Sequence, residues 1–145
     1  MNLKTIFSII FICSVMVSHA QEWQTDFDQA KAIAVKENRQ IIMVFQGSDW
    51  CAPCIKLDHE IWSSEVFKSY AGDHFVMLKV DFPRKKANAL APEQQEKNNK
   101  LAEAYNKQGF FPFVVVFDHQ GNKLGETGYK KIAPDDYIRH LLSFK

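Results

Sequence analysis

The chain has 145 residues, enough for one domain but short for two, and its 18 basic residues nearly balance its 17 acidic ones. Proteins that bind nucleic acid or a membrane surface concentrate an excess of Lys and Arg on one face, so this balance supports neither class. The residues that stand out for their chemistry are three cysteines, at positions 13, 51 and 54.

Residues 1–20 have the pattern of a secretory signal peptide. Lys4 gives a charged start, Thr5–Val17 is almost wholly apolar, and the stretch ends on the small residue Ala20. A membrane-spanning helix needs about 20 apolar residues, so this run is too short for one. A lipid on Cys13 is the weaker alternative, because the residues before it are not the small ones that such processing favours. We therefore expect cleavage after Ala20.

Cleavage would leave one domain over residues 21–145, in the periplasm or secreted, with Cys51 and Cys54 as its two cysteines. It removes Lys4 and no acidic residue, so 17 basic and 17 acidic residues remain. We expect a monomer that binds no nucleic acid and, once the signal is removed, no membrane.

From residue 26 onward the pattern predicts alternating helices and strands. Asp26 is a suitable N-cap for a first helix, whose apolar face carries Phe27, Ala30, Ile33 and Ala34. Three later runs are short and apolar on both faces, as in strands covered on both sides: Ile41–Phe45, Phe75–Val80 and Phe113–Phe117.

Helices are predicted between and after these strands. They cover Cys51–Ile61, Ser64–Tyr70, Glu93–Lys107 and a segment after Pro134 that turns Tyr137, Ile138, Leu141 and Leu142 inward. We expect Gly72 and Gly109 to end the helices that precede them. Arg84–Lys100 should be an exposed loop leading into the third of these helices, and a last short strand should lie near Lys123–Tyr129. The element order predicts an α/β domain with a mixed central sheet.

The segment Trp50-Cys51-Ala52-Pro53-Cys54 follows a buried strand and opens a helix. A cysteine in the first helical turn lies near unpaired N–H groups and the positive end of the helix dipole, which favour the thiolate. We therefore expect Cys51 to be an exposed, acidic nucleophile, and the inward-facing Cys54 to attack the mixed disulfide formed at Cys51. Pro53 fits because the first turn does not use its missing N–H. Asp49, if close, would raise the thiol pKa by repulsion.

Other uses of two cysteines are less favoured. A structural disulfide that closes so short a loop constrains the unfolded chain little. Haem attachment needs His directly after the second cysteine, where this chain has Ile55. A zinc site normally needs four ligands, and the histidines that would have to complete one are scattered: His59, His74, His119 and His140. We expect no bound metal and no cofactor.

On these residues the chain resembles the thioredoxin-like superfamily over essentially all of residues 21–145. The resemblance rests on Trp50-Cys51-Ala52-Pro53-Cys54 and on Gly109-Phe110-Phe111-Pro112, which precedes a strand. It implies a thioredoxin fold, with a mixed sheet of four strands, or five if Glu22-Trp23-Gln24 supplies the first. It also implies that Pro112 is a cis-proline facing the cysteines and pairing with the substrate backbone. The chain is most similar to secreted thioredoxin-like proteins and to the electron-donating domain of transmembrane disulfide reductases.

The chain also departs from the family pattern. Thioredoxins carry a buried aspartate on the strand before the cysteines, which moves the proton of the second thiol, and Met43-Val44-Phe45-Gln46 has no acid there. Asp58, one helical turn past Cys54, where the reductase domain also has a carboxylate, is the candidate proton acceptor. A solvated surface charge is the alternative interpretation of that residue. Phe111 is bulkier than the usual residue before the cis-proline, which would alter the substrate fit.

The predicted function is thiol–disulfide exchange on protein disulfides, outside the cytoplasm and in the reducing direction, with an electron-donor or acceptor protein as second partner. A disulfide oxidase or isomerase is the alternative within this chemistry. Oxidants of the superfamily often have His where this chain has Pro53, and an inserted helical domain that the roughly 30 residues between Asp81 and Phe111 cannot hold. A copper-handling protein is the alternative from another class, because thiolates favour Cu(I). A non-catalytic binding module is disfavoured because both cysteines are present.

Overall fold

Five strands form one mixed sheet in the computed structural model, which describes residues 21–145. The predicted signal peptide and its cleavage site therefore lie outside the described residues, apart from Gln21 itself. The strands are β1 (Trp23–Gln24), β2 (Gln40–Gln46), β3 (Phe75–Asp81), β4 (Phe113–Phe117) and β5 (Lys123–Thr127). They lie in the order β1-β3-β2-β4-β5, with β1 and β2 parallel to β3 and the pairs β2·β4 and β4·β5 antiparallel. The mixed sheet is confirmed, and the residues around Trp23 do supply its fifth strand.

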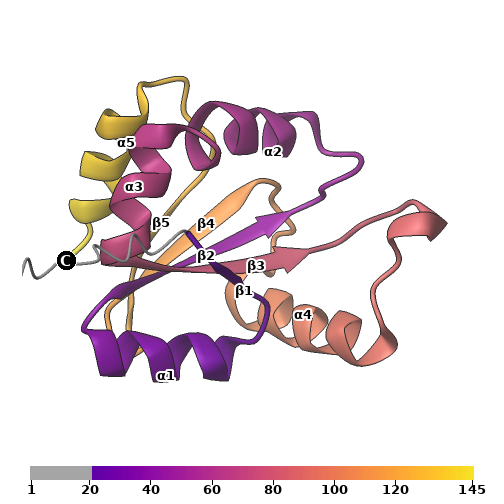
Figure 1. The fold of residues 1–145 in the computed structure, drawn as a ribbon. Coiled ribbons are helices and arrows are strands. Elements are labelled where there is room, and N and C mark those ends of the chain that lie inside the picture. The colour runs from indigo at the N-terminus through magenta and orange to yellow at the C-terminus, as the bar shows by residue number, and fades with distance from the viewer. Residues whose placement is uncertain (1–20) are drawn as a thin grey trace, which may run out of the picture.

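Helices cover both faces of this sheet (Figure 1). Their bounds are α1 (Phe27–Glu37), α2 (Ala52–Leu57), α3 (Glu65–His74), α4 (Pro92–Tyr105) and α5 (Pro134–Leu142). A π-helical turn, η1 (Asp58–Trp62), continues α2, and a short 3-10 turn, η2 (Lys86–Asn88), lies between β3 and α4. Helices α2, α3 and α5 lie on one face, and α1 and α4 on the other.

Capping side chains explain where α1 and α3 begin. Asp26 accepts a hydrogen bond from the backbone N–H of Gln29 at 3.0 Å, as predicted. Ser64 does the same for Phe67 at the start of α3. Both satisfy backbone donors that have no partner within the helix.

Three of the predicted details are wrong. Gly72 does not end α3, which continues to His74 and passes directly into β3, because no left-handed cap is needed there. Gly109 lies beyond the end of α4, in a left-handed turn with φ of 69°. Leu142 is 37 % exposed because consecutive side chains point about 100° apart around a helix, so it leaves the buried face of α5 on which Leu141 lies.

The predicted exposed loop at Arg84–Lys100 is only partly a loop. It contains η2, and α4 already begins at Pro92. Asn98 is 2 % exposed and its amide donates to the backbone oxygen of Asp81 at 2.8 Å. The side chain of Gln94 donates to that of Asn98. The polar composition of this segment predicts exposure to solvent. The side-chain amides of Asn98 and Gln94 instead donate hydrogen bonds, that of Asn98 to the end of β3 and that of Gln94 to Asn98 within α4.

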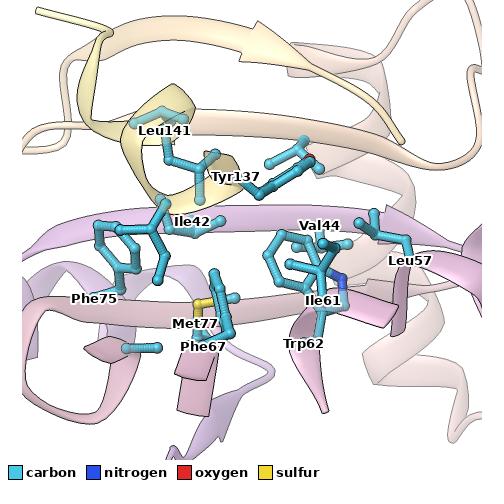
Figure 2. Close-up of a cluster of buried hydrophobic side chains, with 14 residues drawn as sticks. Ile42, Val44, Leu57, Ile61, Trp62, Phe67, Phe75, Met77, Tyr137 and Leu141 are labelled. Atoms are coloured by element: carbon cyan, nitrogen blue, oxygen red, sulfur yellow. The ribbon is translucent and has the colours of Figure 1, made fainter. Parts of the chain in front are cut away.

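The larger apolar cluster fills the space between the sheet and α2, α3 and α5 (Figure 2). Trp62 lies within it and is 2 % exposed. Its ring centre is 4.7 Å from that of Phe67, 5.4 Å from that of Tyr137 and 6.2 Å from that of Trp23. One side chain on η1 thus contacts α3, α5 and β1, and it holds the helix that carries the cysteines against the sheet.

Candidate active site

The two cysteines lie where β2 gives way to α2. Cys51 is the N-cap of α2, and its sulfur accepts a hydrogen bond from the backbone N–H of Cys54 at 3.3 Å. Pro53 occupies the first helical turn, as expected. Cys51 and Cys54 form a disulfide with a Cα–Cα distance of 5.2 Å. The helix N-terminus therefore directs a backbone donor at the first of the two sulfurs.

Exposure does not distinguish the two cysteines in this disulfide form. Each is 4 % exposed, so the expectation of an exposed Cys51 is not met in this oxidised state. The physical reason lies in its surroundings: the sulfur of Cys51 is bonded to that of Cys54 and lies over the first turn of α2. Their positions still differ, because Cys51 precedes the helix and Cys54 lies within it, on the buried side with Leu57.

The loop before β4 lies beside this turn. Phe45 of β2 pairs with Phe113 of β4, so the end of one antiparallel strand meets the beginning of the other at the same edge of the sheet. The Phe111–Pro112 bond is cis, which confirms the geometry that the family resemblance implies. The ring of Phe111 packs edge-on against Trp50, with ring centres 5.4 Å apart. The two motifs found in the sequence are thus brought together.

Trp50 is fixed by contacts on several sides. Its indole N–H donates to the backbone oxygen of Phe82 at 2.7 Å. A Cβ atom on Gly47 would lie 2.2 Å from the indole ring, so only glycine lets the ring occupy this place. The guanidinium carbon of Arg84 lies over the face of the indole ring, 3.6 Å from the ring centre. Trp50 therefore connects the cysteine turn to the segment that follows β3.

Asp49 ties the same two segments together. Its carboxylate accepts hydrogen bonds from the backbone N–H groups of Arg84 at 2.9 Å and Lys85 at 3.0 Å, and from the side-chain amide of Asn88 at 2.9 Å. These bonds, that from Arg84 foremost, hold the pKa of Asp49 below its ordinary value. The sequence predicts that Asp49 repels the thiolate, whereas the hydrogen bonds that its carboxylate accepts anchor the segment 84–88.

A second anchor joins the cysteine loop to the end of β3. Asp81 accepts from both the backbone N–H and the hydroxyl of Ser48, at 2.9 and 2.6 Å. Sequence reasoning missed Ser48, Asp81 and Arg84. A signal was available for the first two, because polar residues that follow the carboxyl ends of neighbouring parallel strands meet at one edge of the sheet.

The Asp49→Asn variant should unfold at a lower urea concentration than the wild type at pH 7. The amide retains one acceptor oxygen and adds an N–H₂ group that faces three donors. Since the pKa of Asp49 is lowered by folding, its contribution is present above the unfolded value of about 3.9 and is lost as pH falls through the folded value. The gap in urea midpoint between wild type and variant should therefore narrow progressively as the pH falls below about 4.

The control for this prediction is Asp73→Asn, which changes an exposed carboxylate on α3. Its urea midpoint should equal that of the wild type at pH 7 and at pH 2.5. A gap between wild type and Asp49→Asn that is as wide at pH 2.5 as at pH 7 would show that charge at position 49 is not what anchors the loop.

Asp58 lies apart from the buried side of this helix. It is exposed, in the first turn of η1, and its carboxylate lies 3.5 Å from the hydroxyl of Ser63. Its part as proton acceptor for Cys54 therefore stays a prediction. The strand position where thioredoxins carry a buried acid holds apolar residues, among them the fully buried Phe45.

Metal ligands do not gather in the part of the chain that the structure describes. Within residues 21–145 there is no group of three or more His, Cys, Asp or Glu side chains arranged to hold a metal ion. Over the same residues, none of the helices combines the length and the apolar character needed to cross a membrane.

Comparisons with known proteins agree with this geometry. A family model described as thioredoxin-like matches residues 22–119. The chain is 37 % identical over 122 residues to the disulfide bond reductase DsbH of Chlamydia pneumoniae, covering 84 % of this chain and 71 % of that protein. A solved structure titled DsbH oxidoreductase superposes with a TM-score of 0.78 at 31 % identity, covering 99 % of this chain and 92 % of the other.

A more distant likeness concerns the fold alone. The C-terminal domain of DsbD from Neisseria meningitidis, in its oxidised form, has a TM-score of 0.54 at 22 % identity, over 82 % of this chain and 93 % of that domain. The fold, the disulfide at the start of α2 and the relatives together define a thiol–disulfide oxidoreductase. The chain belongs to the thioredoxin-like family.

Proposed function

We propose that this protein reduces disulfides of other proteins outside the cytoplasm, with Cys51 as the attacking residue and Cys54 as the residue that releases the product. One observation carries the assignment: the backbone N–H of Cys54, at the start of α2, points at the sulfur of Cys51. The same donor and the helix N-terminus would stabilise a thiolate on Cys51. Among residues 21–145, no hydrogen-bond donor points at the sulfur of Cys54 in the same way.

The reaction transfers two electrons from the dithiol to the substrate. The thiolate of Cys51 attacks one sulfur of the substrate disulfide, a mixed disulfide forms, and the other substrate sulfur leaves as a thiolate that takes up a proton. Cys54 then loses its proton and attacks the sulfur of Cys51. The second substrate thiolate leaves, and the Cys51–Cys54 disulfide described here remains. A dithiol protein must next reduce this pair.

The surrounding residues have supporting parts in this proposal. Trp50 and Phe111 pack against each other beside the cysteine turn and provide an apolar surface for the substrate. Pro112, at the start of β4, would present its backbone to an extended substrate segment. The reducing direction is supported by Ala52 and Pro53, which offer the Cys51 thiolate no charged or hydrogen-bonding side chain, and by the name of the relative DsbH.

Equilibration against glutathione buffers, read as the alkylated fraction, tests the direction. We expect a potential nearer to thioredoxin's value of about −270 mV than to the value of about −120 mV of a periplasmic oxidant. A strongly stabilised thiolate makes an oxidant, and the helix N-terminus alone contributes only about 0.3–1 kcal/mol at an exposed site. A potential above about −150 mV would instead place the protein among the disulfide-forming oxidases.

The place of action and the state of assembly belong to the same proposal. We expect a monomeric protein, exported by a signal peptide that is cleaved after Ala20, in the periplasm or secreted. N-terminal sequencing of the protein from the envelope fraction should begin at Gln21. A chain that still begins at Met1, or a lipid on Cys13, would contradict export by this route.

A further inference from the structure

The segment that Asp49 anchors carries three consecutive basic residues, Arg84, Lys85 and Lys86, and all three are exposed. Within residues 21–145 no ion pair joins any of them to a carboxylate, although many other basic residues have such partners. The neighbouring carboxylates of Asp49 and Asp81 accept hydrogen bonds from N–H and O–H donors and form no ion pair with these three side chains, although the charge of Lys85 helps to lower the pKa of Asp49. Three exposed basic side chains that form no ion pair within the described residues therefore lie together at this end of the molecule, and they outnumber the two carboxylates beside them.

This cluster lies beside the cysteine turn. The segment between β3 and α4 extends from the same end of the sheet as the loop that leads into α2 (Figure 1). Asp49 accepts hydrogen bonds from the backbone N–H groups of Arg84 and Lys85 and forms no ion pair with their side chains. The guanidinium of Arg84 stacks on Trp50, the residue directly before Cys51.

The stacking prepares Arg84 to bind an anion. A guanidinium that lies flat on an aromatic ring keeps its N–H groups in the plane, where two of them can bond a carboxylate side by side. Part of the entropy of this long side chain is already lost in the stack, so less is lost on binding. The chain as a whole carries a formal charge of only +1, so these three basic residues are not part of a generally basic surface.

We propose that Arg84, with Lys85 and Lys86, is a docking site for carboxylates that flank the disulfide of a protein substrate. The occupant is an acidic polypeptide segment, with Asp or Glu side chains close to the cysteine that Cys51 attacks. This inference rests on the proposed function, and it names a feature of the substrates that the enzyme prefers.

Matched disulfide peptides test the inference. Three peptides share one disulfide and differ only in flanking residues, which are Asp, Ser or Lys. The rate constant for oxidation of the reduced protein is measured in a single turnover, so that no donor protein is needed. At low ionic strength the Asp peptide should react about fivefold faster than the Ser peptide, the upper range for an exposed ion pair, and the Lys peptide more slowly. Salt at about 0.5 M should remove most of this preference.

The Arg84→Glu variant should lose the preference, so that the ratio of the Asp rate to the Ser rate falls from about 5 to about 1 or less. The control is Lys36→Glu, which makes the same change of charge in the last turn of α1, on the other face of the sheet from α2. This variant should keep the wild-type ratio. Arg84→Lys should keep part of it, because charge remains but the planar fork is lost. Urea unfolding of each variant checks that it is folded.

The outcomes separate the two proposals. If Arg84→Glu changes the rates with all three peptides by one common factor, Arg84 acts on the Cys51 thiol and the docking site is wrong. Equal wild-type rates with the three peptides would also overturn the docking site while leaving the proposed function intact. If the reduced wild-type protein oxidises with none of them, it is the proposed function that fails.

Discussion

Replacing Cys51 by serine should abolish disulfide reduction, with a fall of at least about 1000-fold, the scale on which loss of a catalytic nucleophile is felt. The serine hydroxyl is not ionised at neutral pH, so the hydrogen bond from the N–H of Cys54 no longer supports an attacking anion. Reduction of a protein disulfide with a chemical donor in excess measures the loss.

Cys54→Ser should fail in a different way. Its Cys51 can still attack, but no second thiol displaces the substrate, so a mixed disulfide with Cys51 accumulates. Mass spectrometry of the trapped species should find the substrate on residue 51 and identify natural partners at the same time. A Cys54→Ser protein that keeps full turnover, or a Cys51→Ser protein that traps substrate on Cys54, would reverse the two roles.

Trp62→Ala should destabilise the fold by about 3–5 kcal/mol, the range for removal of a buried large aromatic side chain. The indole is 2 % exposed and lies against Phe67, Tyr137 and Trp23, so its loss opens a cavity bounded by three elements. Figure 2 shows Trp62 in the same cluster as Phe67 and Tyr137. Urea unfolding at equilibrium gives the difference in free energy of unfolding.

The matched control is Val66→Ala on the adjacent helix α3, where the side chain is 53 % exposed. Such a surface change usually lies within about 0.5 kcal/mol of the wild type. If Trp62→Ala costs no more than Val66→Ala, the indole does not hold η1 against the rest of the core. Reduction activity of the Trp62 variant at temperatures where it remains folded would show whether the site itself survives.

The strands could be predicted because their signal is local. Ile41–Phe45 is apolar at every position and all five residues are buried in β2, as a strand covered on both faces requires. The position of Cys51 at a helix start likewise follows from neighbours within a few residues. The cis bond before Pro112 was implied by resemblance to a family, not by the local pattern, and the structure confirms it.

The anchoring of the cysteine loop could not be predicted in the same way. Arg84, Lys85 and Asn88 read as part of a polar loop, and nothing within that stretch indicates which of its groups meets Asp49. The contacts join positions 35 to 39 apart, so they depend on how β2 and β3 align in the sheet. The end of α3 could not be predicted for a related reason. A glycine such as Gly72 ends a helix only where the chain adopts a left-handed turn, and α3 instead continues to His74 and leads directly into β3.

The difference in sequence separation between the disulfide and the anchors sets an order of events during biosynthesis. Cys51 and Cys54 are three positions apart and can be joined in a nascent chain as soon as both have emerged. The groups that hold Asp49 and Ser48 come from residues 81–88, so the turn acquires its final geometry only after about thirty further residues have been made. If an oxidant, such as a disulfide of another protein, takes two electrons from the thiols of a chain interrupted between these two points, the resulting disulfide lies on a turn that nothing yet anchors.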